Sequence, residues 1–193
     1  MIPTPKHMHT PPPSSHRRRF LGHCAQWLVA GTALPLATPA LAASPDARSL
    51  TLAHTHTNEQ IALVYALGDA FITPALDSLN HFLRDHYNGA VGQMDPALFH
   101  LLHHVRRTLG TSEPFEVISG YRSPATNATL RGTRAGGVAK HSLHMDGKAI
   151  DVRLPGVPLA DLRDAARSLR AGGVGFYPRE QFVHIDTGRV RHW

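Results

Sequence analysis

The sequence predicts an α+β domain in which a small antiparallel sheet is flanked by helices. Two stretches in the middle of the chain repeat apolar residues at helical spacing, and these are Leu76-Leu79-Phe82-Leu83 and Leu98-Leu101-Leu102-Val105. Later segments are short and alternate apolar with polar residues, as strands do when one face is buried. Helices that come first and strands that follow them favour the α+β class.

The first 42 residues are predicted to be a signal peptide of the twin-arginine type. Arg17–Arg19 stand directly before Phe20 and an apolar run that reaches Leu36, and Ala40-Leu41-Ala42 matches a small-x-small cleavage site. This run is too short and too rich in small residues to span a membrane stably. An uncleaved membrane anchor is the alternative. After cleavage, residues 43–193 would form a single domain in the periplasm with no stable membrane span.

Charge and cysteine content exclude several classes of function. The formal net charge is +6, but residues 1–42 hold four of the 20 basic residues and none of the 14 acidic ones, so residues 43–193 carry +2. That balance does not favour nucleic acid as a partner, since nucleic-acid binding needs a concentrated basic surface. The single cysteine, Cys24, lies within the predicted signal, so the mature chain can form neither a disulfide nor a thiolate nucleophile.

Residues 43–92 are expected to form a lead-in segment and a helix that covers one side of the sheet. Ser49–Ala53 alternates like a short strand, and Ile61–Tyr65 is a second strand candidate. The first helix is predicted from about Thr73 to His86, because the apolar stripe described above lies there and Asn88-Gly89 then breaks the chain.

Residues 93–193 are expected to form the core of the domain. Asp95 and Pro96 are suited to the N-cap and first turn of a second helix. That helix carries the second apolar stripe. Phe115–Ser119 is predicted to be a strand, and the residues that follow it predict a sharp turn.

The remaining elements supply the predicted sheet. Lys148–Leu154 alternates, which places Ile150 and Asp151 on opposite faces of a strand. Leu159–Leu169 is amphipathic and helical. Residues 172–186 are predicted to form a β-hairpin whose strands carry polar residues at alternate positions.

Two histidines and an aspartate are candidates for a metal site. His144 and Asp151 are too far apart to be neighbours on one helix, but they can converge if Gly147 turns the chain and Asp151 lies on the strand that follows. His184 lies on another predicted strand. Two imidazoles and one carboxylate leave a fourth position for water, which is typical of catalytic zinc. As a bare spacing, however, the pair is more often surface polarity or a hydrogen-bonded pair.

The residues around this pair resemble a known family. The pattern Ser142-x-His144-x-x-Gly147-x-Ala149-x-Asp151, with Ser119–Ser123 upstream and Phe182–Asp186 downstream, is similar to the zinc D-alanyl-D-alanine peptidases. That group also includes lysostaphin-type enzymes and the hedgehog domain, and the YcbK-like murein endopeptidases of the periplasm are the most similar subgroup. The likeness also covers Leu79–Asp85 and Met94-Asp95-Pro96.

The resemblance implies roles for individual residues. It implies that His144, Asp151 and His184 bind one zinc ion per chain. It implies that Arg122 stabilises the oxyanion formed when water attacks a peptide carbonyl, a role suited to a fixed guanidinium.

Further residues are expected to contact the substrate. By the same resemblance, Ser142 matches a serine of the family that orients the substrate near the metal. Tyr121 is a candidate to line the cleft, with a packed aromatic as the alternative. His141 precedes the motif closely enough to be a minor candidate for substrate contact.

The general base is the point at which the sequence departs from the related carboxypeptidases. Those enzymes have a glutamate three residues before the last histidine, where this chain has Gln181. Asp186 is the favoured replacement, because residues 184 and 186 of a strand face the same way. Glu180 is the alternative base. The alternative role for Asp186 is to orient His184 or Arg122.

The sequence therefore predicts an exported zinc metallopeptidase that hydrolyses the peptide cross-links of peptidoglycan, with stem peptides as its partners. A D-Ala-D-Ala carboxypeptidase is the second hypothesis, and Gln181 argues against it. The third is a zinc-containing cell-wall-binding module without turnover, because a fold does not by itself imply an activity.

Overall fold

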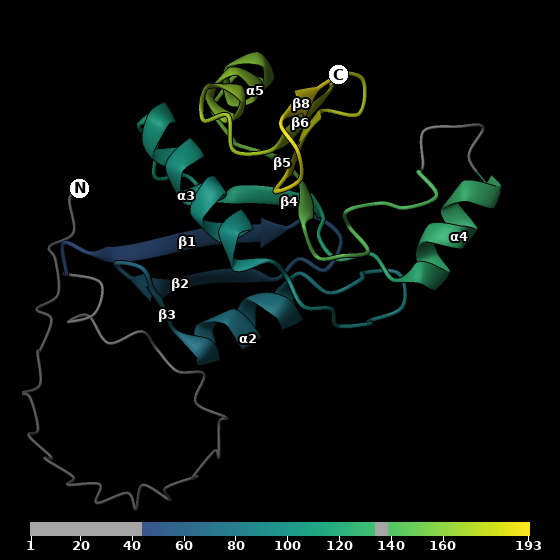
Figure 1. Ribbon diagram of the computed structural model, residues 1–193, viewed down its shortest axis with the longest axis horizontal. Helices are drawn as coiled ribbons and strands as arrows, with labels where there is room; N and C mark the ends of the chain where they lie inside the picture. The colour runs from purple at the N-terminus through teal and green to yellow at the C-terminus, as the bar shows by residue number, and fades with distance from the viewer. Residues whose placement is uncertain (1–43, 134–138) are drawn as a thin grey trace, which may run out of the picture. The chain divides into compact units, whose positions relative to one another are not determined.

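The computed structural model describes residues 44–133 and 139–193, which form a mixed eight-stranded sheet with helices (Figure 1). The predicted signal peptide, residues 1–42, lies outside the described residues. In chain order the strands are β1 Ala47–His54, β2 Gln60–Leu67, β3 Ala70–Phe71, β4 Phe115–Ser119, β5 Ala149–Arg153, β6 Gly173–Tyr177, β7 Phe182–Asp186 and β8 Arg191–His192. The α+β class is confirmed.

The sheet is larger than the small antiparallel sheet predicted, and it is mixed. Its strand order is β3-β2-β1-β4-β5-β7-β6-β8. The pairs β1–β4 and β6–β8 are parallel, and the other pairs are antiparallel. The difference arises because the lead-in segment contributes strands of its own. After β2 and β3, helices α2 and α3 carry the chain across, so that β4 pairs with β1 in parallel.

The helices in the described residues are α2 Thr73–Phe82, α3 Pro96–Leu109, α4 Pro124–Thr133 and α5 Leu159–Ser168. Asp95 caps α3 as predicted, because its Oδ1 accepts a hydrogen bond from the backbone N–H of Ala97 at 3.0 Å. Helix α4 was not predicted, since its buried residues are the polar Thr126 and Asn127 and it has no apolar stripe. Within the described parts of the chain, no helix is both long and apolar enough to cross a membrane.

Helix α2 ends at Phe82, four residues before the predicted end at His86. The chain turns there because the buried carboxylate of Asp85 binds backbone instead of continuing a helix. Asp85 accepts hydrogen bonds from the N–H of Tyr87 at 3.0 Å and of Ser123 at 2.9 Å. The bond from Ser123 ties the segment after α2 to the loop after β4.

The sheet has one face that packs into the core and one that faces away from it. Helices α3 and α5 lie side by side, and Figure 1 shows α4 apart from them. The core formed with these helices takes up Ile150 and Val152 of β5 and Val183 and Ile185 of β7. Because strand residues alternate, the intervening polar residues are on the other face. The alternation predicted for Lys148–Leu154 therefore corresponds to the two faces of the sheet.

Gly147 makes the turn that leads into β5. Its φ is +67°, and a Cβ added there would lie 1.9 Å from the carbonyl oxygen of Gln93. The same close approach lets the N–H of Asp95 donate to the carbonyl of Gly147 at 2.9 Å. The turn is therefore joined to the start of α3.

We predict that Gly147→Ala destabilises the protein by at least about 2 kcal/mol more than Gly156→Ala does. Gly156 is a matched control, because its φ is +74° but a Cβ there would have no atom within 4 Å. Both variants share the backbone strain, and only Gly147→Ala adds the steric clash. Urea unfolding of the two variants measures the difference, and equal unfolding midpoints and slopes would contradict this account of the turn.

Candidate metal centre

The sheet and one loop bring His144, Asp151 and His184 together. Asp151 of β5 is the direct cross-strand partner of His184 of β7, and His144 reaches them from the loop before β5. One ligand atom from each residue lies within 4.8 Å of the others. All three side chains are at least 88% buried, since their exposed fractions are 4% for His144, 9% for Asp151 and 12% for His184. The three residues selected from the sequence thus form a cluster.

A backbone carbonyl orients His144. Its Nδ1 lies 2.8 Å from the carbonyl oxygen of Gly120, and because a carbonyl can only accept, Nδ1 carries the hydrogen. The remaining nitrogen, Nε2, then faces the cluster with its lone pair. Gly120 can hold this place because it packs directly on Leu83, whose carbonyl oxygen would be 2.6 Å from a Cβ at position 120.

A buried carboxylate orients His184 through the opposite nitrogen. His184 Nε2 lies 3.1 Å from Oδ2 of Asp186, so Nδ1 faces Asp151 and His144. Asp186 is fully buried and its oxygens accept several further bonds. The N–H groups of Gly173 and Gly188 donate to Oδ1 at 3.0 and 2.8 Å, and the guanidinium of Arg191 binds both oxygens at 3.1 and 2.8 Å.

The geometry of the cluster fits a tetrahedral metal ion. Zinc bound at about 2.0–2.1 Å by tetrahedral ligands keeps those ligands about 3.3 Å apart. His144 Nε2 is 3.3 Å from both His184 Nδ1 and Asp151 Oδ1, and the third distance, between His184 Nδ1 and Asp151 Oδ1, is 2.8 Å. Each imidazole also donates its other N–H to an oxygen, which is the usual arrangement around metal-binding histidines.

Interactions within the site shift the pKa values of Asp151 and His184. Burial alone would raise the pKa of Asp151, but the imidazoles of His144 and His184 outweigh burial and hold that pKa well below its usual range. Burial lowers the pKa of His184, whereas its bonds to Asp151 and Asp186 raise it, and the balance raises it to about 9. Asp151 is therefore an ionised carboxylate, as a metal ligand must be.

Arg122 and Ser142 stand at the edge of the cluster. The guanidinium Nη2 of Arg122 is 3.9 Å from Oδ2 of Asp151 and 3.4 Å from the hydroxyl of Ser119. Its backbone N–H donates to the carbonyl of His144 at 3.1 Å, so the arginine and the histidine loop are held together. The hydroxyl of Ser142 lies 3.4 Å from the N–H of His144.

A cleft of about 500 Å³ opens onto the cluster. Among the residues selected from the sequence, its lining includes Arg122, Ser142, His141 and Glu180 together with the three cluster residues. Tyr121 is not among the lining residues. Its ring packs against the core and against Gly92, where an added Cβ would lie 2.2 Å away, so the packed alternative describes it.

Asp186 does not line the cleft either. It shares a face with His184, as strand alternation predicted, but its carboxylate binds the imidazole nitrogen that faces away from Asp151 and His144. Five hydrogen bonds saturate its oxygens. The position of Asp186 corresponds to the alternative in which it orients His184.

Sequence reasoning missed two residues of this site, Arg191 and Trp193. Arg191 binds Asp186, and the indole of Trp193 lies 5.4 Å from the imidazole of His184, ring centroid to ring centroid. Both line the cleft. A signal was present in the alternating glycines at 173 and 175, since glycines inside a strand often mark the close approach of another group.

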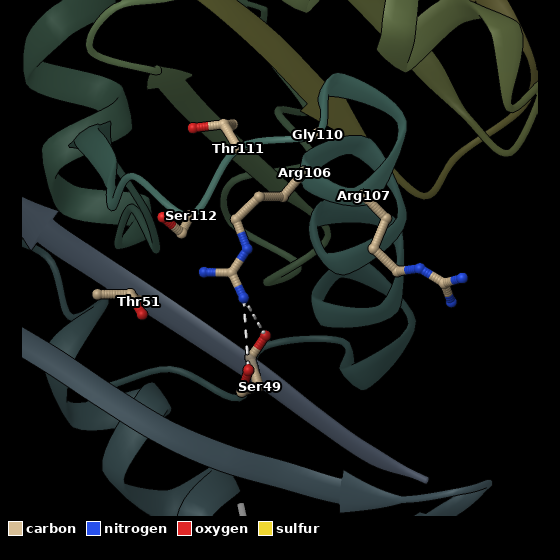
Figure 2. Close-up of a pocket in the computed structure, with 7 residues that line it drawn as sticks. All are labelled: Ser49, Thr51, Arg106, Arg107, Gly110, Thr111 and Ser112. Carbon is tan, nitrogen blue, oxygen red and sulfur yellow. Dashed lines mark hydrogen bonds between the residues drawn. The ribbon is translucent and has the colours of Figure 1, made fainter. Parts of the chain in front are cut away.

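A second hollow lies at the end of α3 and has a different chemistry (Figure 2). Its lining residues include no histidine, carboxylate or cysteine. Arg106 points toward Ser49 and donates to its carbonyl oxygen at 3.0 Å, whereas Arg107 is directed away from Ser49. Within the described residues, the group of three potential metal ligands whose ligand atoms lie close together is His144, Asp151 and His184.

The sheet, the cleft and the His–Asp–His cluster define a domain of the D-alanyl-D-alanine peptidase class. A family model described as "Peptidoglycan L,D-endopeptidase MepK" matches residues 42–193. The chain belongs to this family, which agrees with the resemblance found in its motifs.

Relatives of the same description are similar over nearly their whole length. The peptidoglycan L,D-endopeptidase MepK of Escherichia coli (strain K12) is 48% identical over 181 residues, which cover 93% of this chain and 97% of the relative. The probable peptidoglycan L,D-endopeptidase MepK of Haemophilus influenzae is 41% identical over 175 residues, or 87% of this chain and 94% of the relative. No solved structure gives a significant match.

We predict that His144→Ala loses stoichiometric zinc binding, because the cluster then lacks one of its two imidazoles. His141→Ala is the control, since His141 also lines the cleft but lies outside the cluster. Zinc content after dialysis, measured by atomic emission, should fall from about one ion per chain to near zero in His144→Ala alone. Equal zinc content in both variants would rule out the assignment.

Proposed function

We propose that the protein is an exported zinc metallopeptidase that hydrolyses peptide cross-links of peptidoglycan in the periplasm. The observation that carries this proposal is the pair of imidazoles whose inward-facing nitrogens are fixed by Gly120 and Asp186 beside the carboxylate of Asp151. The similarity to peptidoglycan L,D-endopeptidases supports the substrate class. Export through the twin-arginine route rests on residues 1–42, outside the described residues.

His144, Asp151 and His184 would hold the zinc ion. The ion would supply Lewis-acid chemistry, which lowers the pKa of a water ligand and polarises the carbonyl of the peptide bond. These three residues would leave room for a water ligand, and the cleft would give a substrate access to a metal ion held there.

Arg122 is proposed to stabilise the negative charge that develops on the peptide carbonyl oxygen. Its side chain is 15% exposed and lines the cleft, and its nearest carboxylate oxygen, on Asp151, is 3.9 Å away. The guanidinium is therefore fixed near the cluster while N–H groups remain available to a substrate. A preorganised donor of this kind contributes about 3–4 kcal/mol to transition-state stabilisation. Ser142 is proposed to orient the substrate from the same side.

Glu180 is the proton acceptor that we favour. Asp186 was preferred from the sequence, but its oxygens are occupied by five hydrogen bonds and it lies behind His184. Glu180 is exposed and lines the cleft. It lies in the turn between β6 and β7, next to Gln181, which has a φ of +60° and bonds with its side chain to the carbonyl of Pro178. Two carboxylates line the cleft, and because Asp151 belongs to the metal cluster, Glu180 is the one left to accept a proton.

We predict that the purified protein removes cross-linked dimers from sacculi and yields the matching monomers. The metal hypothesis requires that a zinc chelator abolishes this change and that added zinc restores it. Chromatography of the muropeptides after complete digestion of the glycan strands identifies the bond that is cut. Loss of terminal D-Ala with dimers intact would establish a carboxypeptidase instead. An unchanged profile from zinc-loaded protein that binds sacculi would favour the wall-binding module.

We predict different consequences for the two carboxylates. Glu180→Gln should lower kcat by about 10²–10⁴-fold, because it removes the proton acceptor, and should leave zinc affinity unchanged. Asp186→Asn should instead weaken zinc affinity by about 10–100-fold, because the bond that orients His184 is impaired. Zinc titration and kcat at saturating zinc separate the two effects. A normal kcat in Glu180→Gln would return Asp186 to consideration as the base.

A further inference from the structure

We infer that Trp193 is a positioning residue of the metal site: its indole, braced by Arg191 and Tyr177, holds the imidazole of His184 in its metal-binding orientation. This inference rests on the proposed zinc site. Three observations support it. Backbone hydrogen bonds fix Trp193, glycines on β6 leave room for its indole, and the indole contacts other side chains of the site.

The backbone of Trp193 is fixed to β6. Its carbonyl oxygen accepts a hydrogen bond from the N–H of Phe176 at 3.0 Å, and its own N–H donates to the carbonyl of Val174 at 3.3 Å. These bonds extend the parallel pairing of β8 with β6 by one residue. Trp193 is therefore held at the edge of the sheet on the same face as Arg191, two residues before it.

Two glycines on β6 make room for these side chains. A Cβ at Gly175 would lie 2.7 Å from Cε2 of Trp193, and a Cβ at Gly173 would lie 2.5 Å from Nη1 of Arg191. Gly175 is also the cross-strand partner of His184. Because Gly175 has no side chain, the indole can lie on the backbone directly beside the imidazole.

The indole completes a closed series of contacts among four side chains, which are His184, Asp186, Arg191 and Trp193. His184 Nε2 bonds Asp186 at 3.1 Å, and Asp186 binds Arg191 through both oxygens. The guanidinium carbon of Arg191 lies 4.9 Å from the centroid of the Trp193 ring, a distance at which a cation is attracted to the aromatic face. The indole then returns to His184 at 5.4 Å between ring centroids.

Tyr177 binds the nitrogen of the indole. Its hydroxyl accepts a hydrogen bond from Trp193 Nε1 at 2.8 Å. Trp193 is 47% exposed, so one part of the ring is packed among these groups while another borders the cleft. Asp186 fixes one nitrogen of His184, and the indole limits rotation of the ring about that bond.

We predict that Trp193→Ala weakens zinc affinity about tenfold or more and lowers kcat at subsaturating zinc, whereas Trp193→Phe largely restores both. Loss of a group that orients a metal-binding histidine typically costs about 10–100-fold in affinity. Phenylalanine keeps a ring beside His184 and Arg191 and loses only the bond to Tyr177. The exported and purified protein is titrated with zinc against a chromophoric chelator, and kcat and KM are then measured at subsaturating and at saturating zinc.

His192→Ala is the matched control. His192 is exposed and adjacent to Trp193 on β8, and it does not line the cleft. The zinc affinity and kcat of the His192→Ala variant should equal those of the unmodified protein. Melting of the metal-free proteins checks that Trp193→Ala remains folded. If that variant unfolds, Tyr177→Phe is the second test, and a small loss of zinc affinity with an intact fold is expected.

Unchanged zinc affinity in Trp193→Ala would overturn the inference. A rise in KM with unchanged zinc affinity and kcat would also overturn it, because the indole would then contact only the substrate. Failure of the proposed function looks different: the unmodified protein itself would bind no zinc or cut no cross-link.

Discussion

The pairing of Asp151 with His184 across β5 and β7 is the constraint on which the rest of the site depends. The same transverse row of the sheet continues to Ser119 on one side and Gly175 on the other. A slip of one residue in this register would turn Asp151 or His184 into the helix-covered core and bring an apolar neighbour to the cleft. Burial of Ile150, Val152, Val183 and Ile185 therefore fixes the metal site and the fold together.

The one cluster residue outside the sheet needs separate support. His144 is on a loop, and the structure secures that loop from several directions. Gly120 accepts the imidazole N–H, Arg122 donates to the His144 carbonyl, and the Gly147 turn is bonded to Asp95. Asp85 in turn fixes the loop of Arg122 through Ser123. These residues belong to the segments whose likeness to the family extends beyond the ligands, and their role is to position the loop.

The sequence predicted local structure better than long-range arrangement. Periodicity and capping located α3, β4, β5 and the β6–β7 hairpin, because these features are written in neighbouring residues. The pairing of β1 with β4 depends on contacts far apart in the chain, and α4 lacks an apolar stripe. Alternation placed Asp186 on the face of His184, but only the structure shows which imidazole nitrogen it binds. Trp193 was missed for the same reason. It lies beside His184 only because Trp193 and β7 both pair with β6.

The two histidines are held by unlike partners, and this difference shapes the charge of the site. A neutral carbonyl orients His144, whereas an ionised carboxylate orients His184. A buried carboxylate without a counter-charge would cost about 3–5 kcal/mol, which is why Arg191 must accompany Asp186. The charges of Asp186 and Arg191 then cancel each other behind His184. The negative charge that faces the cluster is therefore that of Asp151. A divalent cation bound there, together with Arg122, would leave the mouth of the cleft positive and therefore attractive to the oxyanion of a peptide under attack.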